Sequence, residues 1–160
     1  MQPAKARKAP DPQFPVQLGR SSAWVGLIYF FVMPWGYWYG DQGESRIRIG
    51  NKVTFWTLGS KEEGLLLLLF LAASILVLAA TYLKVQQVRP SNMILAAAAM
   101  AVVAAYFFRD IMKTPATALK ALTSVGIPAV SVEESGNHWI VWLVIIGYLG
   151  SGLFMRKEGN

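Results

Sequence analysis

Four long, uncharged apolar runs are the feature that most constrains how this chain can fold. They cover residues 22–39, 64–83, 92–108 and 139–155, and the first is dense in aromatic side chains. A bilayer core about 30 Å thick needs about 20 predominantly apolar helical residues, with about 17 as the short limit. The sequence therefore predicts an all-α membrane protein with four transmembrane helices, together forming one domain over residues 22–155.

The overall composition also indicates a membrane protein, and it limits the kinds of catalytic or metal site that the chain can form. Hydrophobic residues make up 54% of the chain and charged residues 15%, whereas soluble domains carry about 25% charged residues. The chain has no cysteine, one histidine and nine carboxylates, so thiolate metal sites and cysteine nucleophiles are excluded. None of the four runs contains Asp, Glu, Lys, Arg or His, although ion pumps and proton relays depend on such groups. We therefore predict that the protein is not an enzyme.

The distribution of basic residues predicts the orientation of the helices. Lysine and arginine are denser in residues 1–21, 84–91 and 156–160 than in the two remaining loops. Positive charge favours the cytoplasmic side, so the proline-rich tail 1–21 and the end 156–160 are expected in the cytoplasm. We predict the bacterial inner membrane as the location. The net charge of +6 is then explained by an anionic leaflet, and no nucleic-acid partner is expected.

Both outer loops carry secondary-structure signals. In the first loop, alternating residues 46–49, a Gly50-Asn51 turn and the β-favouring residues 52–57 predict a small β-hairpin. In the second loop, Thr114 can cap a short helix whose first residue is Pro115. Leu119, Leu122 and Val125 can lie on one face of this helix, so a helix resting on the membrane surface is expected.

Aromatic residues collect where two runs are expected to leave the lipid. Pro34 removes a backbone donor near the end of the first run, so it should kink or end the helix there. Tryptophan and tyrosine rings favour the headgroup layer. We therefore predict a membrane-interface role for five residues: Trp35, Tyr37, Trp38, Tyr39 and Trp139.

Small residues repeat at helical spacing in the third and fourth runs. Ala97, Ala101 and Ala105 share one helix face, and so do Gly147 and Ser151. Small side chains let helix backbones approach closely in a membrane. These faces predict either packing within one four-helix bundle or contact with a partner subunit, and the spacing alone leaves both open.

Two polar features near the helix ends are candidates for ligand binding or ion pairing. His138, the only histidine, is either solvated at the start of the last run or an axial ligand to a haem or chlorophyll-type pigment. Arg109 and Asp110 end the third run and suggest an exposed ion pair of small value. No metal site is predicted.

The topology resembles the plan of the claudin and peripheral myelin protein family, shared by small bacterial four-helix proteins of unknown function. The resemblance lies in the β-prone, tryptophan-containing segment 46–56 and in residues 136–139 leading into a glycine-rich fourth helix. It implies four helices with cytoplasmic ends. The paired loop cysteines of claudins are absent, so no junction-forming role and no functional residues are carried over.

Taken together, these features favour a protein that works by contact. We expect a non-catalytic accessory or scaffolding subunit of a larger membrane complex, such as a respiratory or photosynthetic assembly, with other membrane subunits and lipids as partners. The alternative is a lipid- or pigment-binding membrane protein, with the Trp35–Tyr39 aromatics and His138 lining the site. A passive pore ranks third.

Overall fold

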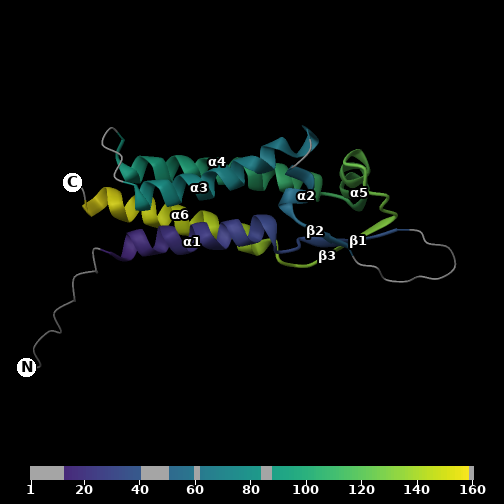
Figure 1. Ribbon diagram of the computed structural model, residues 1–160, viewed down its shortest axis with the longest axis horizontal. Helices are drawn as coiled ribbons and strands as arrows, with labels where there is room; N and C mark the ends of the chain where they lie inside the picture. Colours follow the sequence, from purple (N-terminus) through teal and green to yellow (C-terminus); the bar gives the residue numbers. More distant parts are fainter. Residues whose placement is uncertain (1–12, 41–50, 60–61, 84–87, 159–160) are drawn as a thin grey trace, which may run out of the picture.

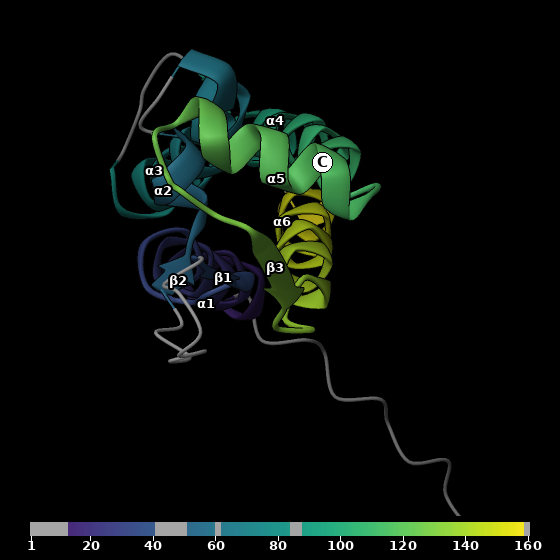
Figure 2. The same cartoon turned by 90° about the vertical axis from the view of Figure 1, so that its right-hand side faces the viewer.

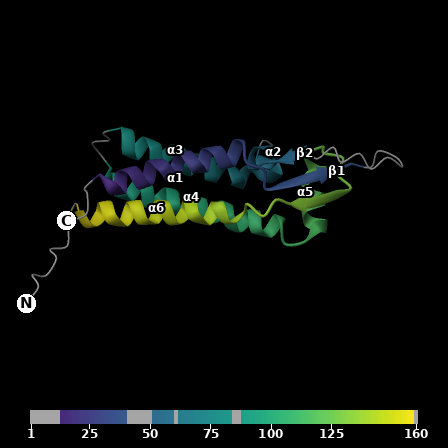
Figure 3. The ribbon, with the colours of Figure 1, turned by 90° about the horizontal axis from the view of Figure 1, so that it is seen from below.

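The computed structural model describes residues 13–40, 51–59, 62–83 and 88–158. Four helices run side by side along its length and form what we call the bundle (Figure 1). The start of α1 and the end of α6 lie at the same end of this bundle (Figures 1 and 3). The four helices are α1 (Phe14–Phe31), α3 (Leu68–Tyr82), α4 (Pro90–Ile111) and α6 (Trp139–Glu158).

The opposite end carries a small mixed structure that we call the cap. A three-stranded antiparallel sheet has the order β2-β1-β3, and Figure 2 shows α5 lying across the end of the bundle near β3. A 3₁₀ segment, η1 (Glu62–Leu67), leads from the cap into α3. The cap consists of β1 (Gly36–Tyr39), β2 (Asn51–Val53), α2 (Phe55–Gly59), α5 (Pro115–Ser124) and β3 (Ser131–Glu134).

Three of the helical segments that the structure describes are long and apolar enough to cross a membrane. They are Gly64–Tyr82, Pro90–Ile111 and Trp139–Lys157, which agree with three of the four predicted runs. The fourth span is not confirmed. Helix α1 has 18 residues, but Gln17 and Arg20 lower its apolar content, because both lie inside the helix rather than before it.

The predicted helix over residues 22–39 was wrong at both ends. Helix α1 begins at Phe14, with Pro15 in its first turn, and ends at Phe31. Pro34 has no backbone N–H, and a residue that precedes a proline is biased away from helical conformation. The aromatic residues that follow then form β1, because tyrosine and tryptophan suit a half-buried strand.

The hairpin prediction was right in kind and wrong in detail. Strand β1 pairs with β2, placing Gly36 opposite Val53, and also with β3, placing Gly36 opposite Glu134. The predicted strand 46–49 lies outside the described residues. The predicted strand 52–57 stops at Val53, because Thr54 and Thr57 exchange backbone-to-side-chain hydrogen bonds of 3.1 and 3.4 Å and so begin helix α2.

Helix α5 has the predicted cap. The Thr114 side chain accepts a hydrogen bond from the Thr117 backbone N–H, the reciprocal bond is also present, and Pro115 starts the helix. Leu122 of its predicted apolar face is buried together with Ala118, whereas Leu119 and Val125 are half-buried. Because α5 packs against β3 and α4, Leu122 belongs to the contact between α5 and the rest of the protein.

The small residues are buried within the chain itself. Ala97, Ala101 and Ala105 are at most 3% exposed, on a helix that packs against α3 and α6. A side chain at Gly147 would meet the Ser22 hydroxyl of α1, and the Ser151 hydroxyl donates a 2.7 Å hydrogen bond to the Pro15 carbonyl. These faces therefore bring α4 and α6 close to their neighbours in the same chain.

A single arginine joins two helices near the end of the bundle that is remote from the cap. The Arg20 Nη2 atom donates a 2.6 Å hydrogen bond to the Thr81 carbonyl oxygen in the last turn of α3. Its guanidinium carbon lies 3.9 Å from the centre of the Tyr82 ring. A cation at the carboxyl end of a helix satisfies a free carbonyl group and complements the helix dipole, so Arg20 stabilises the α1–α3 contact.

Candidate functional site

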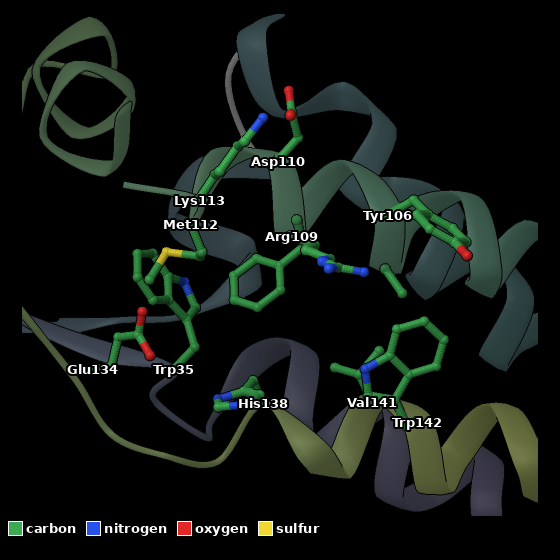
Figure 4. Close-up of a pocket in the computed structure, with 12 residues that line it drawn as sticks. Trp35, Tyr106, Arg109, Asp110, Met112, Lys113, Glu134, His138, Val141 and Trp142 are labelled. Carbon is green, nitrogen blue, oxygen red and sulfur yellow. The ribbon is translucent and has the colours of Figure 1, made fainter. Parts of the chain in front are cut away.

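A cavity of about 850 Å³ lies where α4 and α6 meet the cap (Figure 4). Sites for drug-sized ligands usually occupy about 300–1,000 Å³, so this cavity can hold a sizeable molecule. Its buried wall is entirely aromatic and aliphatic, and consists of Trp35, Ala105, Phe108 and Val141. Its rim is polar and aromatic, and consists of Tyr106, Arg109, Asp110, Met112, Lys113, Glu134, His138 and Trp142.

Trp35 is fixed in this wall by its neighbours on both sides. Its backbone N–H donates to the Val53 carbonyl at 3.0 Å, and its carbonyl accepts from the Ser135 N–H at 2.9 Å. Its ring meets the Phe108 ring edge-on, with centroids 5.5 Å apart. Trp35 is only 2% exposed, and its indole Nε1 has no hydrogen-bond partner among the described residues. A buried donor is thus left over beside the cavity.

Strand β3 places one of its two neighbouring carboxylates at the cavity. Successive side chains of a strand point to opposite faces. The Glu133 carboxylate accepts a 2.8 Å hydrogen bond from the Tyr39 hydroxyl, whereas Glu134 lines the cavity. In Figure 4, Glu134 lies beside Trp35 at one end of the cavity.

The last turn of α4 supplies the basic side of the rim. Figure 4 shows the Arg109 guanidinium pointing toward the Trp142 end of the cavity, with His138 on the opposite wall. Asp110 and Lys113 point away from the centre of the cavity. Neither Arg109 nor Glu134 forms an ion pair with any residue that the structure describes. Among the described residues, Arg109 and Glu134 therefore give the exposed rim of the cavity one positive and one negative side chain without an ion-pair partner.

An exposed aromatic pair forms the side of the cavity next to the bundle. Tyr106 of α4 and Trp142 of α6 meet edge-on, with ring centroids 6.2 Å apart, and are 59% and 40% exposed. Both lie on helices that are apolar enough to cross a membrane. Amphipathic rings near the ends of membrane helices favour the headgroup layer.

The structure distributes the predicted site residues over different roles. His138 lines the cavity, and no group of three metal-ligating side chains occurs in the described part of the chain. Trp139 is exposed, and Tyr37, Trp38 and Tyr39 are half-buried in β1. Trp35 was assigned wrongly to the lipid surface, because the turn after Pro34 directs it into the protein.

Sequence reasoning assigned neither Arg109 nor Glu134 to a binding site, although both line the cavity. Arg109 and Asp110 were expected to form a pair, but Figure 4 shows their charged groups pointing in different directions. Arg109 and Glu134 are far apart in the sequence and belong to no common motif. They line the same cavity because the chain passes through α5 and returns to the sheet as β3. Pro34 is a sequence signal for the burial of Trp35, because it ends the helix before this residue. The prediction extended the helix past Pro34 and so placed Trp35 at the lipid surface.

Known proteins give no guide to the fold or to the cavity. Comparison with protein-family models, with curated proteins and with solved structures found no match for this chain. The claudin-like resemblance therefore stays a prediction from topology, and the function has to be argued from the cavity and the membrane helices.

Proposed function

We propose that this chain is a non-catalytic membrane protein that binds an amphipathic lipid in the cavity between α4, α6 and the cap. The observation that carries the proposal is the cavity itself, with a buried apolar wall and a charged rim at the end of two apolar helices. A molecule with an apolar body and a polar head matches both parts. A purely polar metabolite would leave the apolar wall in contact with water. A hydrocarbon would leave Arg109 and Glu134 without partners.

The test is to purify the protein in mild detergent and identify bound molecules by native mass spectrometry. We expect an amphiphile that survives purification and is lost from an Ala105→Phe variant, because Ala105 belongs to the buried wall. An Ala99→Phe variant adds the same ring on the exposed face of α4 and should retain the molecule. Thermal unfolding of both variants checks that each is folded. Equal occupancy in both variants, or an empty wild-type protein, would refute the proposal.

We also propose that α1 is a fourth membrane span, with the start of α1 and the end of α6 in the cytoplasm of a bacterial cell. Support comes from the packing of α1 against α3 and α6 and from the predicted charge distribution. The chain has no cysteine, so single cysteines report cleanly on sidedness. Ser124→Cys in the cap should react with a membrane-impermeant maleimide in whole cells, and Lys157→Cys should react only after lysis. The reverse pattern would invert the orientation.

A second candidate function is an accessory or scaffolding subunit of a larger membrane complex, such as a respiratory or photosynthetic one. The outward face of α1 favours it, because exposed Gln17 and Ser21 continue into exposed Trp24 and Ile28. Polar groups facing hydrocarbon are costly, and they suit contact with another helix. Replacing Gln17 and Ser21 with leucine should release the partner, as measured by the mass of the complex in mild detergent. A lone, monodisperse wild-type protomer would argue against this role.

A further inference from the structure

We infer that the lipid held in this cavity is an aminophospholipid, whose head carries a phosphate and a protonated primary amine. This inference rests on the proposed lipid-binding function and adds the chemistry of the head group. Its basis is the opposite charge of the two cavity side chains that point inward from different elements, Arg109 of α4 and Glu134 of β3.

The phosphate matches the Arg109 end of the cavity. A guanidinium offers a planar set of donors that suits phosphate oxygens. Arg109 has no ion-pair partner in the described part of the chain, and its side chain reaches toward Trp142 (Figure 4). His138, just before α6, lies on the opposite wall with its ring turned toward the Trp35 end (Figure 4), so Arg109 is the cation of this end of the cavity. An anionic group placed here would pair a charge that no described residue of the chain pairs.

The amine matches the Glu134 end. A primary ammonium group has three N–H donors and can donate a charged hydrogen bond to a carboxylate, whereas a quaternary ammonium group has no N–H to donate. Glu134 is held on the cavity face of β3, because its neighbour Glu133 is bonded to Tyr39 on the other face. A head with phosphate alone would bring a second negative charge toward Glu134 and leave its carboxylate unpaired.

Two charges that do not line the cavity provide matched controls. Arg156 lies in the last turn of α6, at the end of the bundle remote from the cap, and Glu133 lies on the other face of β3, where it accepts from the Tyr39 hydroxyl. The same charge can therefore be removed at the cavity and away from it, with Arg109→Gln against Arg156→Gln and Glu134→Gln against Glu133→Gln.

The apolar surface beside the cavity indicates a lipid rather than a free head group. Exposed Tyr106 and Trp142 flank the site, and exposed Val103 and Ile146 continue from them along α4 and α6. Acyl chains that leave the cavity on this side would lie against these helices in the bilayer. A water-soluble phosphoamine would gain nothing from that surface.

The experiment measures binding of the detergent-purified, delipidated protein to three lipids by titration in native mass spectrometry. The lipids are phosphatidylethanolamine, phosphatidylglycerol and phosphatidylcholine with identical acyl chains. For the wild-type protein we expect phosphatidylethanolamine to bind about tenfold more tightly than the other two, the effect of one well-placed charged hydrogen-bonded contact. Free phosphoethanolamine should fail to compete at the same concentration.

The variants separate the two ends of the head group. Arg109→Gln should weaken both phosphatidylethanolamine and phosphatidylglycerol by about tenfold. Glu134→Gln should weaken phosphatidylethanolamine alone and thereby remove or reverse the preference over phosphatidylglycerol. Arg156→Gln and Glu133→Gln should each change the affinity by less than about twofold, as expected of exposed charges away from the cavity.

The possible outcomes distinguish this inference from the proposed function. Equal binding of the three lipids, or a preference that Glu134→Gln leaves unchanged, would overturn the aminophospholipid inference while leaving lipid binding intact. Competition by free phosphoethanolamine at lipid-like affinity would overturn the lipid as the source of the head group. A wild-type protein that binds none of the three lipids would overturn both the inference and the proposed function.

Discussion

The bundle and the cap are held together by different kinds of contact. In the bundle, small residues bring helices close, and side-chain hydrogen bonds such as Tyr148 to Ser74 at 2.8 Å lie deep between them. In the cap, backbone pairing and short polar contacts dominate, as where the Ser135 hydroxyl donates to the Pro34 carbonyl at 2.7 Å. The cavity lies at the boundary, where side chains of both regions line it but neither region satisfies all of their charges.

The largest expected effect comes from the junction of the two regions. A Cβ atom added at Gly64 would overlap the Leu58 carbonyl group and lie 2.8 Å from the Gly59 nitrogen. Backbone atoms cannot move aside as a flexible side chain can, so Gly64→Ala should lower the free energy of unfolding by about 3 kcal/mol or more. Thermal unfolding in detergent measures this loss. Gly150→Ala is the control, since its Cβ would meet only a Leu18 side-chain atom at 3.3 Å; equal melting of both variants contradicts the prediction.

A smaller effect is expected inside the bundle. In Gly147→Ala the new methyl group would overlap the Ser22 hydroxyl and lie 2.8 Å from the Ser22 Cβ. Helix α1 then has to move away from α6, at a cost of about 1–3 kcal/mol. The double variant with Ser22→Gly removes both contacting atoms and should recover most of the stability in the same unfolding assay. No recovery would mean that close approach of α1 and α6 is not the cause.

In the cap, loss of a helix cap should stay local. Thr114→Ala removes the side chain that accepts from the Thr117 N–H, and such caps contribute about 1 kcal/mol. Hydrogen exchange should speed up in α5 while protection of α3, α4 and α6 stays unchanged. Thr123→Ala is the matched control, because its hydroxyl bonds only to the Leu119 carbonyl within the same helix. Faster exchange throughout the bundle would show that the two regions unfold as one unit.

The smallest effect is expected for the buried polar pair of the bundle. Tyr148→Phe removes the hydroxyl that donates to Ser74, but the Ser74 hydroxyl keeps its 3.0 Å bond to the Phe70 carbonyl. Hydrogen bonds between membrane helices contribute about 0.6 kcal/mol on average. A double-mutant cycle with Ser74→Ala, measured by unfolding in detergent, should give a coupling of that size. A coupling near zero would leave close packing as the main interaction between these helices.

Three of the four membrane runs could be located from the sequence because hydropathy accumulates over a whole helix. Residues 64–83, 92–108 and 139–155 match apolar helices of the structure within a few residues. Helix α1 could not be placed in the same way. Its first half contains Gln17 and Arg20, and the partner that satisfies Arg20 is a backbone carbonyl in another helix, which leaves no mark in the sequence.

The cap and the site were harder to predict because their residues are brought together by tertiary structure. The aromatic segment after Pro34 suits a membrane interface and a strand equally well, and only pairing with β2 and β3 decides between them. His138 was identified because it is unique in the chain. Arg109 and Glu134 were not, because surface charges carry no local signal of what they face.

The contact made by Arg20 has a consequence for how the protein enters its membrane. During synthesis α1 emerges first. The hydrogen bond of Arg20 can form only after Thr81, 61 residues further along the chain, has also been synthesised. An arginine at the centre of an isolated membrane helix costs about 2.5–3.5 kcal/mol, and less near an end, where a long side chain reaches the headgroup layer. Arg20 lies in the first half of α1. If α1 is the fourth span proposed above, its insertion is favoured by the presence of α3, whose Thr81 carbonyl group accepts from Arg20.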